Sequence, residues 1–506
     1  MTTPSTKAVA PTEQPTLRAT SRLTLPVVLV GVALVAMSIS GTAIALPDIG
    51  NDLDAAGSLL NWVVAGYNLA FAAMTLVVGA AADRAGRRRV FIIAAALFAA
   101  GFVATAYAPT IQILDIARVV SGVGGAGVMA AGGALLAQAY EGAARNRAFA
   151  LMGTMAGVGI AVGPTLLGGL ISVVGWRGSF GVFAAVAVMV TIGATRLTES
   201  RDEAARTDWI GSSLFAVTLS AFMFGLLEGP EYGWAHPAVL VGFGIGLAAA
   251  VAFALSQRRS SAPILARELV AHRGFMGWCL ATLTTSIGFL GVLVFLPTYL
   301  QSVSGYTPIA AGLVMLLLTA PVLVSPMLAA TLVNRGLSAR LLILVALVLV
   351  VLGNVGLLAL RPEHTTGPLV VPLLLIGIGM GASFGITDGQ AMALIPSRLV
   401  GTAAGFLNTL RGAAEAMVIA VFSASLLAVL TDRLGDARHA ADVSAGHLAE
   451  TGSTVRDVEI DALTGSWHFT QIGVGTLCLI LTITVAVLLF TRTQHDHEKE
   501  AHAPGT

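Results

Sequence analysis

The stretch Gly79-Ala80-Ala81-Ala82-Asp83-Arg84-Ala85-Gly86-Arg87-Arg88-Arg89 decides the fold, because it places dense charge between two long apolar runs. Four of its residues are arginines. An arginine at the centre of a bilayer costs about 2.5 to 3.5 kcal/mol on insertion scales, so this stretch must lie in water. Loops rich in arginine and lysine stay on the cytoplasmic side of a membrane. We therefore expect this loop to be cytoplasmic and to fix the orientation of the chain.

The composition is that of a membrane protein with many spans. The 506 residues are 56% hydrophobic and only 11% charged, and the mean hydropathy is +0.86. Soluble domains carry about 25% charged residues, so a soluble globule is excluded. The two cysteines, Cys279 and Cys478, both lie in apolar runs. Neither a disulfide framework nor a metal cluster is expected.

Fourteen apolar runs are long enough to cross about 30 Å of hydrocarbon. They begin near Leu25, Leu59, Val90, Ile111, Arg147, Gly178, Trp209, Ala235, Gly274, Pro308, Arg340, Pro368, Val400 and His468. The first run covers about 20 residues, which exceeds the roughly 7 to 15 of a signal-peptide core, so it is expected to be retained. An even number of spans places both ends of the chain on one side.

The charges of the loops agree with this count. The basic loops share the side of the Gly79 loop: Arg145 and Arg147, 196–206, 258–273, Arg335 and Arg340, Arg398, and 492–499. The opposite loops are acidic or neutral, namely 48–54, 228–231 and 298–307, with Arg177 and Arg361 as exceptions. Both termini are therefore expected to be cytoplasmic.

The order of spans indicates two bundles of six helices with an inserted pair between them. The predicted units are a cytoplasmic tail 1–22, a first bundle 23–198, an inserted pair 199–260, a second bundle 261–493 and a cytoplasmic tail 494–506. The second bundle contains a hydrophilic segment, 431–467, which we expect to be an extracytoplasmic loop. Parallel halves of this kind usually meet at a cavity near the bilayer midplane, where cargo would bind.

The pattern GxxxDRxGRR that begins at Gly79 resembles the signature loop GxLxDRxGRR/K of the major facilitator superfamily. The resemblance implies an all-α major facilitator fold with 14 transmembrane helices. It also implies a cytoplasmic latch between the two halves, made by Gly79, Asp83, Arg84, Gly86, Arg87 and Arg88. The alternative interpretation is an ordinary basic anchor with a tight glycine turn.

Two segments within the spans also resemble motifs of this superfamily. The segment Arg118–Ala126 is similar to RxxQGxGxA, with Ser121 in place of glutamine, and relatives associate this arginine with proton coupling. A buried arginine needs a partner, and Asp115 is the nearest acid on its helix face. The alternative is a purely structural ion pair that fixes the rotation of the helix.

The segment Gly159–Gly169 resembles GxxxGPxxGG, a motif of the antiporter branch, although Leu167 replaces one glycine. Gly159 and Gly163 would allow close helix approach, and Pro164 would bend the helix. Generic helix packing is the alternative interpretation of this motif.

Two further segments resemble the fourteen-span drug:proton antiporters. Residues 296–313 are similar to LPxYLQxxxGYSPxxAG, and residues 62–69 are similar to WVxxaYxLa. One departure concerns the first span, where that family commonly has an acidic residue and this chain has Ser38. Coupling to protons must therefore use another carboxylate.

Glu415 is the first candidate for that carboxylate, because it lies near mid-membrane with Arg411 one turn before it, at pairing distance. Asp388 and Asp115 are the second and third candidates. A carboxyl group holds its proton in an apolar surrounding and releases it beside an arginine. A static salt bridge between Glu415 and Arg411 is the structural alternative.

A cargo cavity would need apolar and adaptable walls. The candidates for its lining are Ser38, Phe289, Tyr299, Phe384 and Phe406, together with Phe295, Met380 and Met417. Such side chains more often belong to the core or face lipid.

These observations predict a proton-coupled antiporter of the inner membrane that exports hydrophobic or amphipathic molecules by alternating access. Its expected partners are small-molecule cargo, protons and the lipid bilayer, without nucleic acid, cofactor or metal, and we expect it to act as a monomer. The chain has no GxxxxGK[ST] loop, so an ion gradient is the expected energy source. A dedicated exporter or importer of one metabolite is the alternative, followed by a non-transporting sensor or scaffold. The sequence contains no recognisable pairing of a nucleophile with a base, so it gives no indication of an enzyme.

Overall fold

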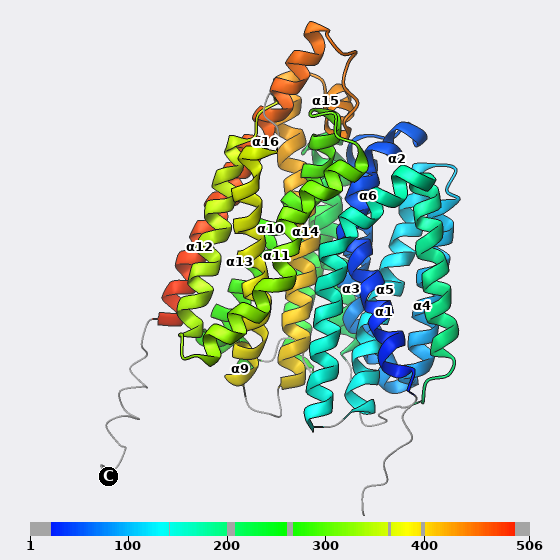
Figure 1. Ribbon diagram of the computed structural model, residues 1–506, viewed down its shortest axis with the longest axis vertical. Helices are drawn as coiled ribbons and strands as arrows, with labels where there is room; N and C mark the ends of the chain where they lie inside the picture. The colour runs from blue at the N-terminus through cyan, green and yellow to red at the C-terminus, as the bar shows by residue number, and fades with distance from the viewer. Residues whose placement is uncertain are drawn as a thin grey trace, which may run out of the picture.

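The computed structural model describes residues 22–140, 142–199, 208–260, 267–362, 366–395 and 400–490. These residues form helices and short connections, and no strand occurs among them. Figure 1 shows the helices of the first half of the chain (blue to cyan) beside those of the last part (yellow to red), with their axes roughly parallel. Twelve helical segments of the described chain are long and apolar enough to cross a membrane. The predicted all-α, many-span architecture is confirmed at this level.

The first part of the chain contains the helices that the apolar runs predicted. They are α1 (Thr24–Gly41), the 3₁₀ turn η1 (Thr42–Ala45), α2 (Leu46–Leu53), α3 (Gly57–Ala85), α4 (Arg87–Ala106), α5 (Ile111–Ala139) and α6 (Gly142–Ala194). Gly86, with φ +113°, separates α3 from α4. Gly175, with φ 70° and ψ 174°, breaks the regular geometry of α6. Two predicted spans, from Arg147 and from Gly178, therefore lie within one long element.

The remaining helices complete the structure. They are α7 (Trp209–Tyr232), α8 (Pro237–Arg259), α9 (Arg267–Ala271), α10 (Arg273–Ser302), α11 (Pro308–Asn334), α12 (Ala339–Gly356), η2 (Leu357–Ala359), α13 (Gly367–Ala393), α14 (Val400–Leu434), α15 (Ala437–Ala445) and α16 (Thr454–Phe490). Residues 228–231 were predicted to be a loop and are instead the last turn of α7.

The hydrophilic segment 431–467 is also more ordered than the predicted loop. It comprises the end of α14, the whole of α15 and the first turns of α16. Asp436 caps α15, because its Oδ1 accepts a hydrogen bond of 2.8 Å from the backbone N–H of His439. Gly446, with φ +96°, ends the same helix. Local capping thus stabilises a helix that polarity alone does not reveal.

Two helix pairs join the early and late parts of the chain. In the first pair, α6 packs on α11, where the Thr165 hydroxyl donates to the carbonyl of Gly312 (2.9 Å) and the Thr319 hydroxyl donates to the carbonyl of Ala161 (2.8 Å). In the second pair, α3 packs on α14, where Asn61 Nδ2 donates to Ser423 Oγ (2.7 Å). A smaller contact joins η1 and α10, where Gln301 Nε2 donates to the carbonyl of Ile44 (3.2 Å), so movement of one part against the other would change all three contacts.

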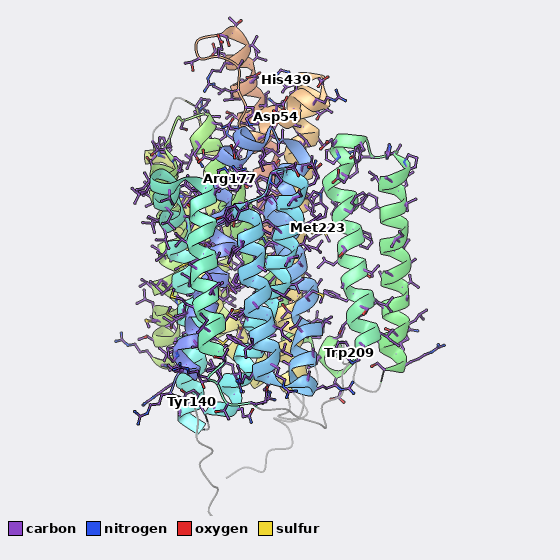
Figure 2. All side chains as sticks on the ribbon, turned by 90° about the vertical axis from the view of Figure 1, so that its right-hand side faces the viewer. Asp54, Tyr140, Arg177, Trp209, Met223 and His439 are labelled. Atoms are coloured by element: carbon purple, nitrogen blue, oxygen red, sulfur yellow. The ribbon has the colours of Figure 1, made fainter. Side chains whose placement is uncertain are left out.

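Helices α7 and α8 form a pair at the side of the molecule (Figure 2). They pack mainly against each other, and α7 also contacts α3 and α14. Ring contacts join the pair, with centroids 5.9 Å apart for Phe215 and Phe253 and 6.2 Å apart for Phe222 and Phe243. The pair of α7 and α8, which the sequence predicts to be an insertion, therefore lies beside the contact between α3 and α14.

The two ends of the helices carry the residues that the charge pattern separated. Figure 2 shows Asp54, Arg177 and His439 near one end, and Tyr140 and Trp209 near the other. This agrees with the predicted alternation of loops. The predicted tails, Arg398, and most of the connector 199–207 lie outside the described residues.

Close packing of α6 on α1 gives a testable consequence. A Cβ atom added to Gly159 would lie 2.6 Å from the carbonyl oxygen of Ala33 and 2.6 Å from Ala36 Cβ. Gly159→Ala is therefore expected to lower stability by about 1–3 kcal/mol, as overpacking does. Thermal unfolding of the detergent-solubilised protein measures this loss. Gly153→Ala is the matched control, since no atom lies within 4 Å of the added Cβ; equal melting temperatures for the two variants would contradict the packing argument.

Candidate functional site

A fully buried arginine on α5 lies at the centre of the first candidate site. Arg118 donates from Nε to the carbonyl of Val63 (3.0 Å), from Nη1 to Ser38 Oγ (3.2 Å) and from Nη2 to Thr42 Oγ1 (3.1 Å). Its guanidinium carbon lies 4.4 Å from the centre of the Tyr67 ring, a cation–π contact. One side chain thus fastens α5 to the first helix and to α3.

Arg118 and Asp115 attract each other electrostatically, but they do not form the predicted close pair. No ion pair within 4.0 Å joins them, and in the described chain no other carboxylate pairs with Arg118. Asp115 Oδ1 is buried and has no hydrogen-bond partner. The guanidinium instead turns toward uncharged oxygens on α1, η1 and α3. Ser38, which replaces the expected acid, therefore contacts Arg118 directly but supplies no counter-charge.

The second candidate site lies on α13 and α14. Arg411 Nη2 lies 2.7 Å from Asp388 Oδ1, and its guanidinium carbon lies 4.9 Å from the centre of the Phe384 ring. Arg411 and Glu415 interact electrostatically but form no ion pair within 4.0 Å, and the close partner of the arginine is Asp388 of the neighbouring helix. Glu415 is half-buried, and within the described residues it has no hydrogen-bond or ion-pair partner. The site thus holds an ion pair and a separate, unpaired carboxyl group.

Several candidates for the cargo cavity lie in packed surroundings in this structure. Phe289 and Tyr299 belong to the buried core, and the Tyr299 hydroxyl lies 2.8 Å from Thr464 Oγ1. Phe406 is buried against Phe275, with ring centroids 5.9 Å apart. A narrow void, too tight for a water molecule, lies between α10, α13 and α14. It is lined by Thr282, Thr285, Met380, Ser383, Phe384, Thr387 and Arg411. Cargo contact by the predicted set stays a prediction.

The charged loop at Gly86 is fastened to the end of α6. Glu199 accepts hydrogen bonds from the backbone N–H groups of Arg88 (3.0 Å) and Arg89 (3.2 Å), so it caps the first turn of α4. Arg87 Nη1 donates to Gln138 Oε1 of α5 (3.2 Å). The Asp83 side chain lies outside what the structure describes. The latch between the two halves therefore stays a prediction, and Glu199 is a partner that sequence reasoning missed.

The predicted kink residues of α6 lie in a regular stretch of helix. Gly159, Gly163 and Pro164 keep helical dihedral angles, and the non-helical residue of α6 is Gly175. The glycines pack against α1, where the Ser40 hydroxyl donates to the carbonyl of Gly159 (3.3 Å). In this structure their visible role is close packing.

A buried glutamate on the inserted helix α7 was not predicted as a site. Glu228 is 6% exposed and accepts a hydrogen bond of 2.8 Å from Trp62 Nε1 of α3. The sequence Glu-Gly-Pro-Glu resembles a polar turn, which hid its position inside a helix. The usable signal is its spacing of three residues from Glu231, which places both acids on one helix face.

Comparisons with known proteins decide the family. Residues 28–419 match the family described as Major Facilitator Superfamily. The chain belongs to this superfamily. It is 32% identical over 421 residues to the Multidrug resistance protein Stp of Mycobacterium tuberculosis, covering 82% of this chain and 78% of that protein. It is 33% identical over 407 residues to the Puromycin resistance protein pur8 of Streptomyces alboniger, covering 79% and 80%.

Solved structures of other transporters share the major facilitator fold. A bacterial homolog of the human lysosomal transporter Spinster, inward-facing and unoccupied, has a TM-score of 0.65 at 14% identity and covers 95% of this chain and 100% of its own. The peptide transporter POT in complex with sulfate has a TM-score of 0.62 at 14% identity, with coverages of 92% and 95%. At this identity the likeness concerns the fold alone. As a major facilitator superfamily member, the chain is a multi-pass membrane transporter rather than an enzyme.

Proposed function

We propose that this protein exports hydrophobic or amphipathic small molecules in exchange for protons, by alternating access. The names of similar proteins support efflux, since they include a multidrug resistance protein and antibiotic resistance proteins. The fold supports alternating access, because two helix pairs, α6 with α11 and α3 with α14, connect parts that can rock against each other.

The observation that carries proton coupling is the unpaired carboxyl group of Glu415. It lies on α14, which packs against α3 of the other half as well as against α10. An ionisable side chain inside a membrane raises the free energy of the folded protein, so such residues usually have a functional role. At this position rocking would change its neighbours, which is how a proton is loaded on one side and released on the other. Arg411 and Asp388 beside it, and Arg118 with Asp115 in the first half, complete the proposed coupling set.

We further propose fourteen spans, arranged as two six-helix bundles with α7 and α8 inserted between them. The 29-residue helix α3 and the break of α6 at Gly175 support this count beyond the twelve apolar segments. The proposed units are 23–198, 199–260 and 261–493, with both tails in the cytoplasm and the chain in the cytoplasmic membrane. In this arrangement Asp83, Arg84, Arg87 and Arg88 would gate the cytoplasmic side.

Dye transport in proteoliposomes tests the proposed function. An imposed pH gradient should drive uphill movement of a fluorescent amphipathic dye by the wild-type protein, and a protonophore that collapses the gradient should stop it. Empty liposomes give the background. Equal rates of dye transport with and without the pH gradient would contradict proton coupling but would not contradict export.

A second candidate is a dedicated exporter of one natural product. Ser38 in place of a first-span acid favours a neutral or anionic cargo over cationic drugs. Some relatives are named for single compounds, such as puromycin and methylenomycin A, and another is named a probable actinorhodin transporter. Wild-type protein that moves none of a panel of dyes, yet carries one such compound along the gradient, would select this candidate.

A further inference from the structure

Two carboxyl groups of the inserted helix α7 meet the first turn of α3. Glu228 Oε1 accepts a hydrogen bond from Trp62 Nε1 (2.8 Å), and Glu228 Oε2 lies 3.1 Å from Ser58 Oγ. Glu231 Oε2 lies 2.6 Å from the same Ser58 Oγ and accepts the backbone N–H of Ser58 (3.1 Å). Ser58 is 2% exposed and Glu228 is 6% exposed, so water does not take part freely.

The single hydroxyl hydrogen of Ser58 cannot form a full hydrogen bond to both carboxylates at once. A serine hydroxyl has one hydrogen to donate and two lone pairs that accept. Its oxygen lies within hydrogen-bond distance of one oxygen from Glu228 and one from Glu231. If both acids were ionised, one of these two contacts would join bare oxygens without a hydrogen between them. One additional proton at this contact would give both oxygen pairs a hydrogen, and the geometry favours that arrangement.

The surroundings decide which acid holds that proton. Glu231 accepts two hydrogen bonds from Ser58 at the N-terminus of α3, where the helix dipole favours a negative charge. Its distance of 2.6 Å to the Ser58 hydroxyl is that of an O–H···O⁻ bond. Glu228 is more deeply buried and farther from Ser58. A proton on Glu228 Oε2 donates to Ser58 Oγ, and Glu228 Oε1 still accepts from Trp62.

Within the described residues, the groups that act on Glu228 carry no positive charge. Asp115 on α5 repels Glu228 and is itself attracted by Arg118, and its Oδ1 is buried without a hydrogen-bond partner. Tyr232 follows Glu231 on α7 and interacts with both acids. Helix α15 presents Ala441 at this place. Throughout the described ranges, no basic side chain forms an ion pair with Glu228 or Glu231. A proton is the counter-charge that remains.

We propose that Glu228, held by Ser58 and Trp62, is a proton-binding site between the inserted helix α7 and the first bundle. Loss of its proton would leave two carboxylates and a single hydroxyl hydrogen between them, so the hydrogen bond between Glu228 and Ser58 would be lost and the contact of α7 with α3 would weaken. Because α7 also packs on α14, a shift of α7 would alter the packing where α3 of the first half meets α14 of the second. A role in coupling rests on the proposed antiport, whereas the presence of the proton does not.

Infrared spectroscopy of the purified protein tests for the proton directly. The wild type at neutral pH should show the C=O stretching band of a protonated carboxyl group, with its shift in D₂O. Glu228→Gln should remove one component of this band, because the amide carries no carboxylic proton while it can keep the hydrogen bonds to Ser58 and Trp62. The component of any proton on Glu415 should remain in this variant and disappear in Glu415→Gln. Ser58→Ala should keep the band and shift it, since the O–H loses its acceptor. Glu450→Gln, at an exposed position, is the control without effect. A band of equal intensity and position in the wild type, Glu228→Gln and Ser58→Ala would overturn the assignment.

Transport measurements then test the coupling role separately. Glu228→Gln should still equilibrate dye down its concentration gradient and should lose uphill transport driven by pH. If the variant keeps full uphill transport, the proton is structural and its coupling role is rejected. If the wild type itself ignores the pH gradient, the proposed antiport fails, while the infrared result stands independently.

Discussion

Glu415→Gln is expected to reduce uphill dye transport under a pH gradient to the level of protein-free liposomes. The amide keeps the size of the side chain but cannot bind and release a proton. Downhill dye movement should persist, because the substitution removes no described hydrogen bond or ion pair. Parallel measurements of uphill and downhill flux in the same preparation separate these two effects.

The matched comparison for Glu415 is Asp388→Asn. Asp388 lies 2.7 Å from Arg411, so its neutralisation removes a negative charge that opposes the attraction between Arg411 and Glu415. Without that charge, the field of Arg411 should act more strongly on Glu415, and uphill transport should need a lower pH on the side where the proton is loaded. If Glu415→Gln transports dye uphill at the wild-type rate, Glu415 is not the coupling residue. Asp388 and Asp115 would then be the remaining candidates.

The positions of the helices could be predicted from the sequence because hydrocarbon imposes a simple length rule. The apolar runs that begin near Ile111 and Pro308, for example, coincide with the starts of α5 and α11. The rule fails where polar residues are helical. The sequence of residues 228–231 is typical of a turn, so it did not predict that α7 extends to this point. These residues can be helical because partners on α3 form hydrogen bonds with the Glu228 carboxyl group.

The partners of the buried charges could not be predicted. Sequence reasoning sees neighbours three or four residues apart on one helix, so it paired Arg118 with Asp115 and Arg411 with Glu415. In the structure, Arg118 binds Ser38, 80 residues away, and Arg411 binds Asp388, 23 residues away. Tertiary packing decides which neighbour a long, flexible arginine reaches. Residue types at these sites were therefore predictable, while their contacts were not.

Arg118→Met is expected to destabilise the protein by about 3 kcal/mol or more, since each buried polar group left unsatisfied costs roughly 1–3 kcal/mol. The substitution removes the donors that Val63, Ser38 and Thr42 use. Thermal unfolding in detergent and the yield of monodisperse protein measure the loss. Arg177→Met is the matched control: this arginine is partly exposed and pairs with Asp52, and exposed pairs contribute only about 0–1 kcal/mol. Equal melting temperatures for the two variants would contradict a central structural role for Arg118.

In the described chain no carboxylate lies within ion-pairing distance of Arg118, and this allows a second test of its role. In the wild type a buried guanidinium faces the uncharged hydroxyl of Ser38, 3.2 Å away, so a carboxylate at this position would complete an ion pair. Ser38→Asp should therefore be tolerated while Arg118 is present. The same change in an Arg118→Met background should lower stability further by about 3–5 kcal/mol, because it leaves a buried charge without compensation. The difference between the two backgrounds, measured as a double-mutant cycle, reports the charge at this site rather than side-chain volume. Equal effects of Ser38→Asp in both backgrounds would mean that Arg118 acts here through its shape and hydrogen bonds alone.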